Sequence, residues 1–583
     1  MNEKFSLDKN EIENNINEIH KLLIEESLDA IYITSSDIFL SEYVPLQECL
    51  RYYVTGFTGS TAELLLLKTG EVVLFVDGRY HEQADLEVNA ELVTVHKCLM
   101  GKRPSEDFLI YLDNNNLKTV GVIPSRTSKK MSDLISENHE LRMVSESKVG
   151  DRIKLTKYQK QSEVRSLSLD IVGESTAEKI KRIAGNNSGV FISSLDSIAW
   201  VSNMRSFQLP FQSTFMAKAF FNQDNLFLFV LSDTKDSFPQ IKLDSIKIIE
   251  IDSWDNIQQY LQKVTSGDVY ETIYFDSSNL TSLDYHCLVN IFGEQKLIDQ
   301  PKMMIKHHSM KNEYEMKAIV SSFNNADEAI YNTIKQIKGD FESKDKISEL
   351  DCYNTANEIY KEGGAKAQSF KTIMGVGPNS SIIHYSTPSP TVILKDGDLV
   401  LMDSGGYYES GYATDTTRTF TVGSKTPASI YIEIYTLVLK GLLNAMNAVF
   451  PIGTTGNTID EITRGPLQDK GYDYSHGTGH GVGINVHEGN YLIAPKSKVP
   501  LQLGTIGSIE PGIYIPEIGG VRLENVVSVI NHPNQEGMLM FNPLVYIGFD
   551  HSLIDLSMLS DDEKVMLDDY EQECLKRNRS FKV

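Results

Sequence analysis

The sequence predicts an α/β (α+β) chain of several domains, with the chemically richest region in its last third. Three observations lead to this fold class: a length of 583 residues, an internal repeat of strand-forming segments, and apolar strands that carry isolated carboxylates. At about 150 residues per domain, the length corresponds to three or four domains. The apolar content of 41% and the charged content of 23% are ordinary for globular proteins, so each domain can bury a core.

The repeat relates two regions that each begin with a short strand and continue into a hairpin. Residues 31–37 (IYITSSD) parallel residues 190–196 (VFISSLD), and residues 62–77 parallel residues 216–231. Both longer segments have the pattern of a strand, a polar turn and a second strand. We therefore predict two related α/β domains. A chance likeness between strands of similar composition is the alternative.

The predicted domains follow from this repeat and from changes in composition. The expected boundaries give a first domain at 1–153, a second at 154–305, a third at 306–540 and a C-terminal extension at 541–583. The first boundary rests on the polar segment 151–160, which is expected to open a long helical pattern. Apolar residues at helical spacing predict a helix over 310–337. The extension is expected to end in a charged helix that Ser560 caps.

Composition and charge exclude several classes of function. The net charge of -24 argues against a nucleic-acid partner and against binding to anionic membranes. The five cysteines are far apart and form no CxxC motif, which indicates free thiols in a reducing compartment. The polar N-terminus does not resemble a signal peptide. We therefore expect a cytoplasmic protein.

Five residues of metal-binding type mark the third domain, each in a distinctive motif. They are Asp403 in LVLMDSGG, Asp415 in ATDTTRTF, His480 in HGTGHGVG, Glu510 in SIEPGIY and Glu524 in GGVRLENVV. This oxygen-rich set suits divalent cations better than a closed thiolate zinc site. Taken singly, each aspartate is more readily explained as a turn or capping residue. Glu524 has a similar alternative, an exposed ion pair with Arg522.

Taken together, the five residues indicate a two-metal hydrolase. A hairpin would bring Asp403 and Asp415 to one end of a sheet. Four convergent carboxylates would repel one another and raise each other's pKa. Two divalent cations would neutralise that charge, and carboxylates that bridge them would hold the ions about 3.5–4 Å apart.

In their order and context, these motifs resemble those of the pita-bread metallopeptidases. The whole chain is similar to the cytosolic-type, three-domain Xaa-Pro aminopeptidases (aminopeptidase P) of that family. The further motifs that carry this resemblance are SEYVPLQECLRYYVTGFTGSTAE, VDGRY, SLDSIAWVSNMRS, GVGPNSSIIHYS and FNPLVYIGFDHS. The resemblance implies two creatinase-like N-terminal α/β domains followed by a pita-bread catalytic domain.

The resemblance also implies an activity and a set of roles. The enzyme would hydrolyse the bond between an N-terminal residue and a penultimate proline, through a hydroxide bound to two metal ions. Mn²⁺ is the expected metal, with Zn²⁺ or Co²⁺ as alternatives. Peptides with a penultimate proline would be its partners, and the enzyme would form a homodimer.

Each site residue takes an implied role from the same resemblance. Asp403 would bind one metal, His480 and Glu510 would bind the other, and Asp415 and Glu524 would bridge both. Glu510 would also carry the proton. The other catalytic or substrate-binding positions, which include the ligand His480, are His384, His476, His487 and Arg79.

Two features depart from the family pattern. Asp403 and Asp415 are twelve positions apart instead of eleven, and Thr414 occupies the expected position. We infer a one-residue insertion within residues 406–412, because a shift of register would otherwise turn the aspartate to the opposite face. The second departure is a short His480–His487 interval, which leaves the preferred substrate size open. A prolidase, a general aminopeptidase and a protein without catalytic activity are the alternatives.

Overall fold

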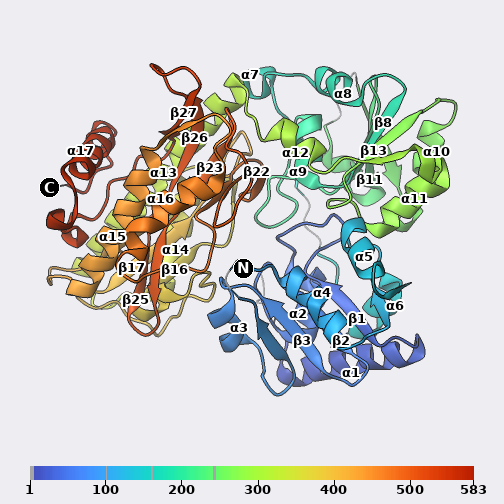
Figure 1. Cartoon of the computed structure of the whole chain (residues 1–583), viewed down its shortest axis with the longest axis horizontal. Coiled ribbons are helices and arrows are strands. Elements are labelled where there is room, and N and C mark those ends of the chain that lie inside the picture. Colours follow the sequence, from blue (N-terminus) through green and yellow to red (C-terminus); the bar gives the residue numbers. More distant parts are fainter. Residues whose placement is uncertain (1–5, 100, 159–161, 240–244, 583) are drawn as a thin grey trace. The chain divides into compact units, whose positions relative to one another are not determined.

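Figure 1 shows the computed structural model, which describes residues 1–583 except 1–5, 100, 159–161, 240–244 and 583. The chain divides into two compact units. The first unit comprises Met1–Leu169, Glu174–Pro210 and Thr214–Met304, and the second comprises Asp170–Gly173, Phe211–Ser213 and Ile305–Val583.

The N-terminal half of the first unit is a six-stranded sheet with the strand order β4-β3-β2-β1-β5-β6. Its strands are β1 (Ala30–Thr34), β2 (Glu63–Leu67), β3 (Val72–Val76), β4 (Thr94–Lys97), β5 (Thr119–Val122) and β6 (Glu140–Met143). Its helices are α1 (Lys9–Glu25), α2 (Leu50–Thr55), α3 (His81–Glu87), α4 (Pro104–Asn114), α5 (Lys129–Ser136) and α6 (Glu146–Ile153). Strand β1 pairs antiparallel with β2 and parallel with β5.

Helices cover both faces of this sheet, which explains why its central strands are apolar throughout. Because side chains alternate along a strand, Ile31 and Leu64 contribute to one core, with Ile19 of α1. Tyr32 and Leu65 contribute to a second core, with Phe108 and other residues of α4 and α5. Burial on both faces is typical of a sheet whose crossover connections are helical.

The second half of the first unit repeats this topology, with the strand order β12-β11-β10-β8-β13-β14. The strands are β7 (Arg165–Ser166), β8 (Ser188–Ile192), β9 (Met204–Arg205), β10 (Lys218–Phe221), β11 (Leu226–Leu231), β12 (Ile246–Ile251), β13 (Thr272–Phe275) and β14 (Leu297–Asp299). The helices are α8 (Thr176–Ala184), α9 (Leu195–Ser202), α10 (Ile257–Thr265) and α11 (Ser282–Phe292). Two further helices, α7 (Leu169–Val172) and α12 (Met303–His308), each include residues of both units. Both predicted hairpins are present, as β2–β3 and β10–β11.

The expectation that residues 151–160 open a long helix is wrong. Helix α6 already includes residues 151–153 and ends at Ile153, because Lys154 adopts a left-handed conformation with φ 53°. Residues 159 and 160 lie outside the described part of the chain, and the next helix, α7, has four residues. The exact domain boundaries stay predictions.

The second unit combines long helices with several sheets of two to six strands. Its helices are α13 (Glu313–Ser343), α14 (Glu349–Glu362), α15 (Ser429–Met446), α16 (Gly456–Gln468) and α17 (Asp561–Lys576). Its first strands are β15 (Ala367–Gln368), β16 (Ile373–Val376), β17 (Leu399–Ser404), β18 (Gly406–Tyr407), β19 (Thr416–Thr421) and β20 (Val449–Pro451). The remaining strands are β21 (Gly479–Gly481), β22 (Glu488–Ile493), β23 (Ile506–Ile509), β24 (Gly512–Ile515), β25 (Gly519–Arg522), β26 (Asn525–Asn531) and β27 (Met538–Pro543).

Two sheets of this unit carry the candidate site. They have the strand orders β16-β17-β19 and β20-β27-β26-β23-β21-β22. One core joins α15, α16 and α17 to the strands, with Leu439, Ile459, Val527 and Leu567 among its buried residues. Dense packing of this kind holds strand ends in fixed positions, which a site assembled from several strands requires.

Both helices expected in this region are confirmed. Helix α13 buries Ile319, Phe323 and Ala326, which lie on the predicted apolar face. Ser560 caps α17 in a reciprocal capping box with Glu563, so that the helix begins where the sequence indicated.

None of the helices in the described part of the chain combines the length and apolar character that a bilayer span requires.

Candidate metal centre

The first two carboxylates come from one hairpin. Strands β17 and β19 pair antiparallel, and Asp403 lies opposite Thr417. Asp415 lies directly before β19, and both aspartates are buried. The predicted hairpin geometry is confirmed.

The other three candidates lie on the neighbouring strands. His480 is the central residue of β21, which pairs with β23, and Glu510 follows β23 directly. Glu524 lies directly before β26, and its backbone N–H donates to the carbonyl of Thr417. That hydrogen bond joins the strands of Glu524 to the hairpin of the two aspartates.

These side chains converge. His480 Nε2 lies 3.5 Å from Asp415 Oδ2 and 3.3 Å from Glu510 Oε1. Candidate ligand atoms of Asp415, His480 and Glu524 all lie within 4.8 Å of one another. Asp403 adds to the electrostatic repulsion on Asp415, Glu510 and Glu524, which places it in the same group of charges.

The twelve-residue spacing does not turn Asp415 away from this group. Thr414, which occupies the position expected for the aspartate, uses its hydroxyl within the turn. This hydroxyl donates to the carbonyl of Gly406 at 3.1 Å and accepts from the Gly406 N–H at 2.9 Å. The turn therefore absorbs the extra residue, and the Asp415 carboxylate faces His480.

The sequence suggested an exposed ion pair between Glu524 and Arg522 as an alternative, but these two described residues do not form it. Glu524 is 1% exposed, and its Oε2 accepts a hydrogen bond of 2.9 Å from the Thr417 hydroxyl. Arg522 instead donates from Nη2 to Asp403 Oδ2 at 2.7 Å. The arginine therefore orients an aspartate on another strand and adds one positive charge to the group.

Burial and mutual repulsion disfavour the charged forms of these carboxylates. Burial first, and then the neighbouring carboxylates, raise the pKa values of Asp415 and Glu524 well above the ordinary range. Burial also raises the pKa of Glu510 to about 7. Among the described residues, no donor meets Asp403 Oδ1 or Glu524 Oε1, although both atoms are buried. Buried acceptors of this kind fit divalent cations, which bind carboxylate oxygens and compensate their charge.

The predicted histidines surround this group to different degrees. The His487 ring lies 4.3 Å from the His480 ring, edge to face, and its charge also acts on Glu510. His476 Nε2 lies 2.8 Å from the hydroxyl of Tyr514. His384 is half-buried in the loop after a short 3-10 helix, Gly377–Ser381.

Arg79 belongs to the first unit, in the turn between β3 and α3. Its guanidinium donates to both carboxylate oxygens of Asp77, at 2.9 and 2.8 Å. This bidentate pair fixes the direction of the arginine side chain. A role in substrate binding stays a prediction.

Two supporting residues were missed in the sequence. Thr417 holds Glu524, and Ser508 donates to Glu510 Oε1 at 3.1 Å while accepting from the His480 N–H. Each lies two positions from a candidate ligand, so that the alternation of a strand places both side chains on one face. A search at this spacing would have found both residues.

A group of four carboxylates and one imidazole, of which Asp403, Asp415 and Glu524 are buried, has unpartnered oxygens and a compensating arginine. It defines a candidate dinuclear metallohydrolase centre. Comparison with known families agrees with this class. The family model of metallopeptidase family M24 matches residues 318–531. Models of the creatinase/prolidase N-terminal domain match residues 16–153 and 156–315. Residues 318–531 thus match metallopeptidase family M24, and the predicted family resemblance and fold class are confirmed.

Curated relatives match almost the whole chain. A probable Xaa-Pro aminopeptidase P of Talaromyces stipitatus is 29% identical, over 97% of this chain and 89% of the relative. A protein of the same name from Aspergillus niger is 27% identical, over 97% of this chain and 95% of the relative.

Solved structures show the same fold. The X-prolyl aminopeptidase of Caenorhabditis elegans, described as a cytosolic enzyme with a di-nuclear active site, matches with a TM-score of 0.86 at 22% identity. That match covers 97% of this chain and 95% of the other. An Xaa-Pro dipeptidase from Bacillus anthracis matches with a TM-score of 0.52 at 24% identity, over 64% of this chain and 98% of its own.

Proposed function

We propose that this chain is an Xaa-Pro aminopeptidase, which hydrolyses the bond between an N-terminal residue and a penultimate proline. The observation that carries the proposal is the group of convergent carboxylates with two unpartnered buried oxygens, on Asp403 and Glu524. The specificity for proline is supported by the near full-length likeness to relatives named Xaa-Pro aminopeptidase P.

We further propose two divalent cations at this centre, with Mn²⁺ as the native metal. Asp403 would bind one ion, His480 and Glu510 the other, and Asp415 and Glu524 both. The donor set is dominated by carboxylate oxygens, which suit Mn²⁺, while the single imidazole would also accept Zn²⁺ or Co²⁺. When bound, such a pair of ions lowers the pKa of a shared water toward neutrality and polarises the scissile carbonyl.

The protein's own groups would move the proton and hold the substrate. Glu510, whose Oε1 lies 3.3 Å from His480 Nε2, would accept a proton from water at this centre. It would deliver that proton to the proline nitrogen, which must be protonated to leave. His487, beside His480, would donate a hydrogen bond to the developing oxyanion.

The remaining polar groups would orient the peptide. His384 and His476 would contact the substrate backbone, and the 2.8 Å contact with Tyr514 supports the orientation of the His476 ring. The substrate's free N-terminal amine would lie near the carboxylates, whose negative charge attracts it. Proline has no N–H, so the site must select for ring shape and not for a donor.

A proline requirement separates this proposal from its alternatives. We expect an Xaa-Pro-Pro peptide to be cleaved with a kcat/KM at least about a hundredfold above that of an Xaa-Ala-Pro peptide. The assay follows release of the N-terminal residue from both peptides and from the Xaa-Pro dipeptide. Preference for the alanine peptide would indicate a general aminopeptidase, and cleavage of the dipeptide alone would indicate a prolidase; either result contradicts the proposal.

We propose that Arg79 binds the peptide across a homodimer. Replacing Arg79 with alanine is expected to raise KM by about 10–100-fold, because a hydrogen bond from a charged group is worth about 1.5–3 kcal/mol. Metal content should stay unchanged. Arg142, which pairs with Glu140 within β6, supplies the matched control Arg142→Ala. Loss of metal in Arg79→Ala would contradict this role, and a monomer by light scattering would contradict the dimer.

We propose a cytoplasmic location, supported by five free cysteines that are all buried. Peptides are the proposed partners, and the acidic net charge of -24 disfavours nucleic acid and anionic membranes. Fractionation of cells tests the location, and recovery of the protein from a secretory or membrane fraction would contradict it.

A further inference from the structure

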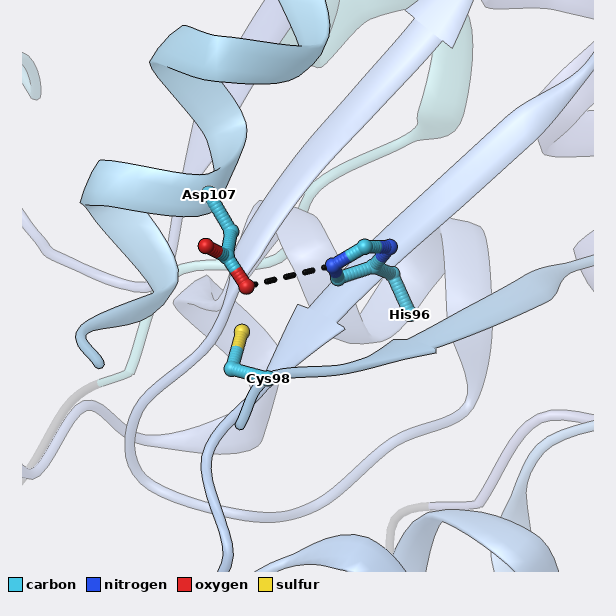
Figure 2. Close-up of side chains that lie close together, drawn as sticks. All are labelled: His96, Cys98 and Asp107. Carbon is cyan, nitrogen blue, oxygen red and sulfur yellow. Dashed lines mark hydrogen bonds and ion pairs between the residues drawn. The ribbon is translucent and has the colours of Figure 1, made fainter. Parts of the chain in front are cut away.

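Outside the M24 domain, three side chains of metal-binding type converge in the first unit. His96 lies on β4, Cys98 follows that strand, and Asp107 lies in the first turn of α4. Their candidate ligand atoms all lie within 4.8 Å of one another. Figure 2 shows the imidazole and the carboxylate pointing toward each other, with the sulfur beneath them.

We propose that His96, Cys98 and Asp107 form a binding site for a thiophilic divalent cation of the zinc type. This site is separate from the oxygen-rich centre of the proposed peptidase and does not depend on that function. Imidazole, thiolate and carboxylate are the three kinds of side chain that Zn²⁺ binds in proteins.

The distance between the nitrogen and oxygen donors suits a tetrahedral ion. His96 Nε2 lies 3.2 Å from Asp107 Oδ2. Nitrogen and oxygen donors about 2.0–2.1 Å from a tetrahedral zinc ion are separated by about 3.3 Å, so this pair needs almost no rearrangement. His96 and Cys98 are two residues apart at the end of a strand, and alternation therefore places both on the same face.

The surroundings hold the three groups in place. The His96 ring packs against Phe75 with centroids 4.9 Å apart, and Cys98 is 1% exposed. Lys102 Nζ lies 3.4 Å from Asp107 Oδ1, which leaves Oδ2 directed at the imidazole. The His96 side chain is 40% exposed, so that an ion can enter beside it and water can occupy a fourth position.

The charges of the ligands match that of the ion, and the Lys102 ammonium adds one positive charge beside Asp107. A thiolate and a carboxylate carry two negative charges, against the two positive charges of the ion. Without metal, burial and the Asp107 carboxylate raise the pKa of the Cys98 thiol to about 12. Binding must therefore release the thiol proton, which coordination to zinc achieves. A bound ion would tie β4 to α4 across the segment that connects them.

Cobalt absorption distinguishes this site from the peptidase centre. Only a cysteine ligand gives a thiolate-to-Co²⁺ charge-transfer band in the near ultraviolet, and the M24-domain candidates contain no sulfur. The full-length protein, reduced and freed of metal with a chelator, is titrated with Co²⁺. We expect the band to saturate at one equivalent of thiolate-bound cobalt per chain and to disappear when Zn²⁺ is added.

Three variants assign the band. Cys98→Ser should lose it, while the matched control Cys352→Ser, which alters another buried free cysteine, should keep it. His96→Ala changes a partly exposed side chain and should weaken Co²⁺ binding by at least about a hundredfold, since even outer-shell partners contribute about 10–100-fold. The proposal would be overturned if the wild-type protein showed no band or if the band survived in Cys98→Ser. Asp107 would then be only a hydrogen-bond acceptor for its neighbours.

Cleavage of Xaa-Pro-Pro should be unchanged in Cys98→Ser, so loss of the band and loss of peptidase activity are distinguishable.

Discussion

Replacing Glu510 with glutamine is expected to lower kcat for an Xaa-Pro-Pro peptide by about a thousandfold or more. The proposed proton transfer alone contributes about 10²–10⁴-fold in comparable enzymes. The substitution also removes one anionic ligand, which weakens the hold on one metal ion. Glutamine keeps the volume of the side chain and an oxygen that can accept from the Ser508 hydroxyl, so the fold should survive.

Glu536→Gln is the matched control for this measurement. Glu536 is exposed in a turn of the same domain, between β26 and β27. We expect this variant to retain wild-type kcat, with both variants showing the wild-type thermal transition within a few degrees. Near-normal turnover by Glu510→Gln would place the reaction centre elsewhere in the chain.

Replacing Glu524 with glutamine should lower activity when metal is present and raise the stability of the fold when metal is absent. With Mn²⁺, the loss of a bridging carboxylate should leave fewer than two ions per chain and lower kcat by about a hundredfold or more. Without metal, the variant should be more stable than the wild type at pH 7. The reason is that Glu524 is buried beside other carboxylates, which raise its pKa well above the ordinary value.

The pH dependence follows from the same shift. A carboxyl group whose pKa is higher in the folded than in the unfolded state binds protons more tightly in the folded state. The free energy of unfolding of the metal-free protein therefore falls as the pH rises above about 4.3, the pKa of a glutamate in the unfolded state. Each such group lowers this free energy by up to about 1.4 kcal/mol per pH unit until the pH passes the group's pKa in the folded state. For Glu510, whose pKa in the folded state is raised to about 7, this loss of stability ends near pH 7.

Urea unfolding in a chelator at pH 5 and pH 7 measures both effects. The wild type should lose more stability between these two pH values than Glu524→Gln, because the variant lacks one titrating group and relieves the repulsion on Asp415. Carboxyl groups elsewhere are common to both proteins and cancel in the comparison. Equal losses in the two proteins would show that Glu524 is not part of a repelling group.

Local features of the fold could be predicted because each has a nearby cause. The apolar run before Asp403 specified β17, alternation specified the two hairpins, and Ser560 marked the start of α17. The prediction for residues 151–160 was wrong because Lys154 ends the helix in a left-handed conformation, which a polar composition does not reveal.

The convergence of the site could not be predicted in the same way. The Arg522 guanidinium lies 2.7 Å from an Asp403 oxygen that is 119 positions away in the chain, and this contact depends on how separate sheets pack. The sequence suggested Glu524 as the nearer partner of Arg522. Similarly, the sequence does not indicate that Asp107 lies beside His96 and Cys98, because that position depends on how α4 packs.

A titration of the metal-free, full-length protein with Mn²⁺, followed by cleavage of an Xaa-Pro-Pro peptide, tests the two-metal assignment most directly. Mn²⁺ prefers oxygen ligands, so the cysteine-containing cluster should not contribute to the stoichiometry. A two-metal peptidase should have negligible activity at the start and should reach full activity at two equivalents per chain. Full activity in the metal-free protein, or no activity at any Mn²⁺, Zn²⁺ or Co²⁺ concentration, would contradict the assignment.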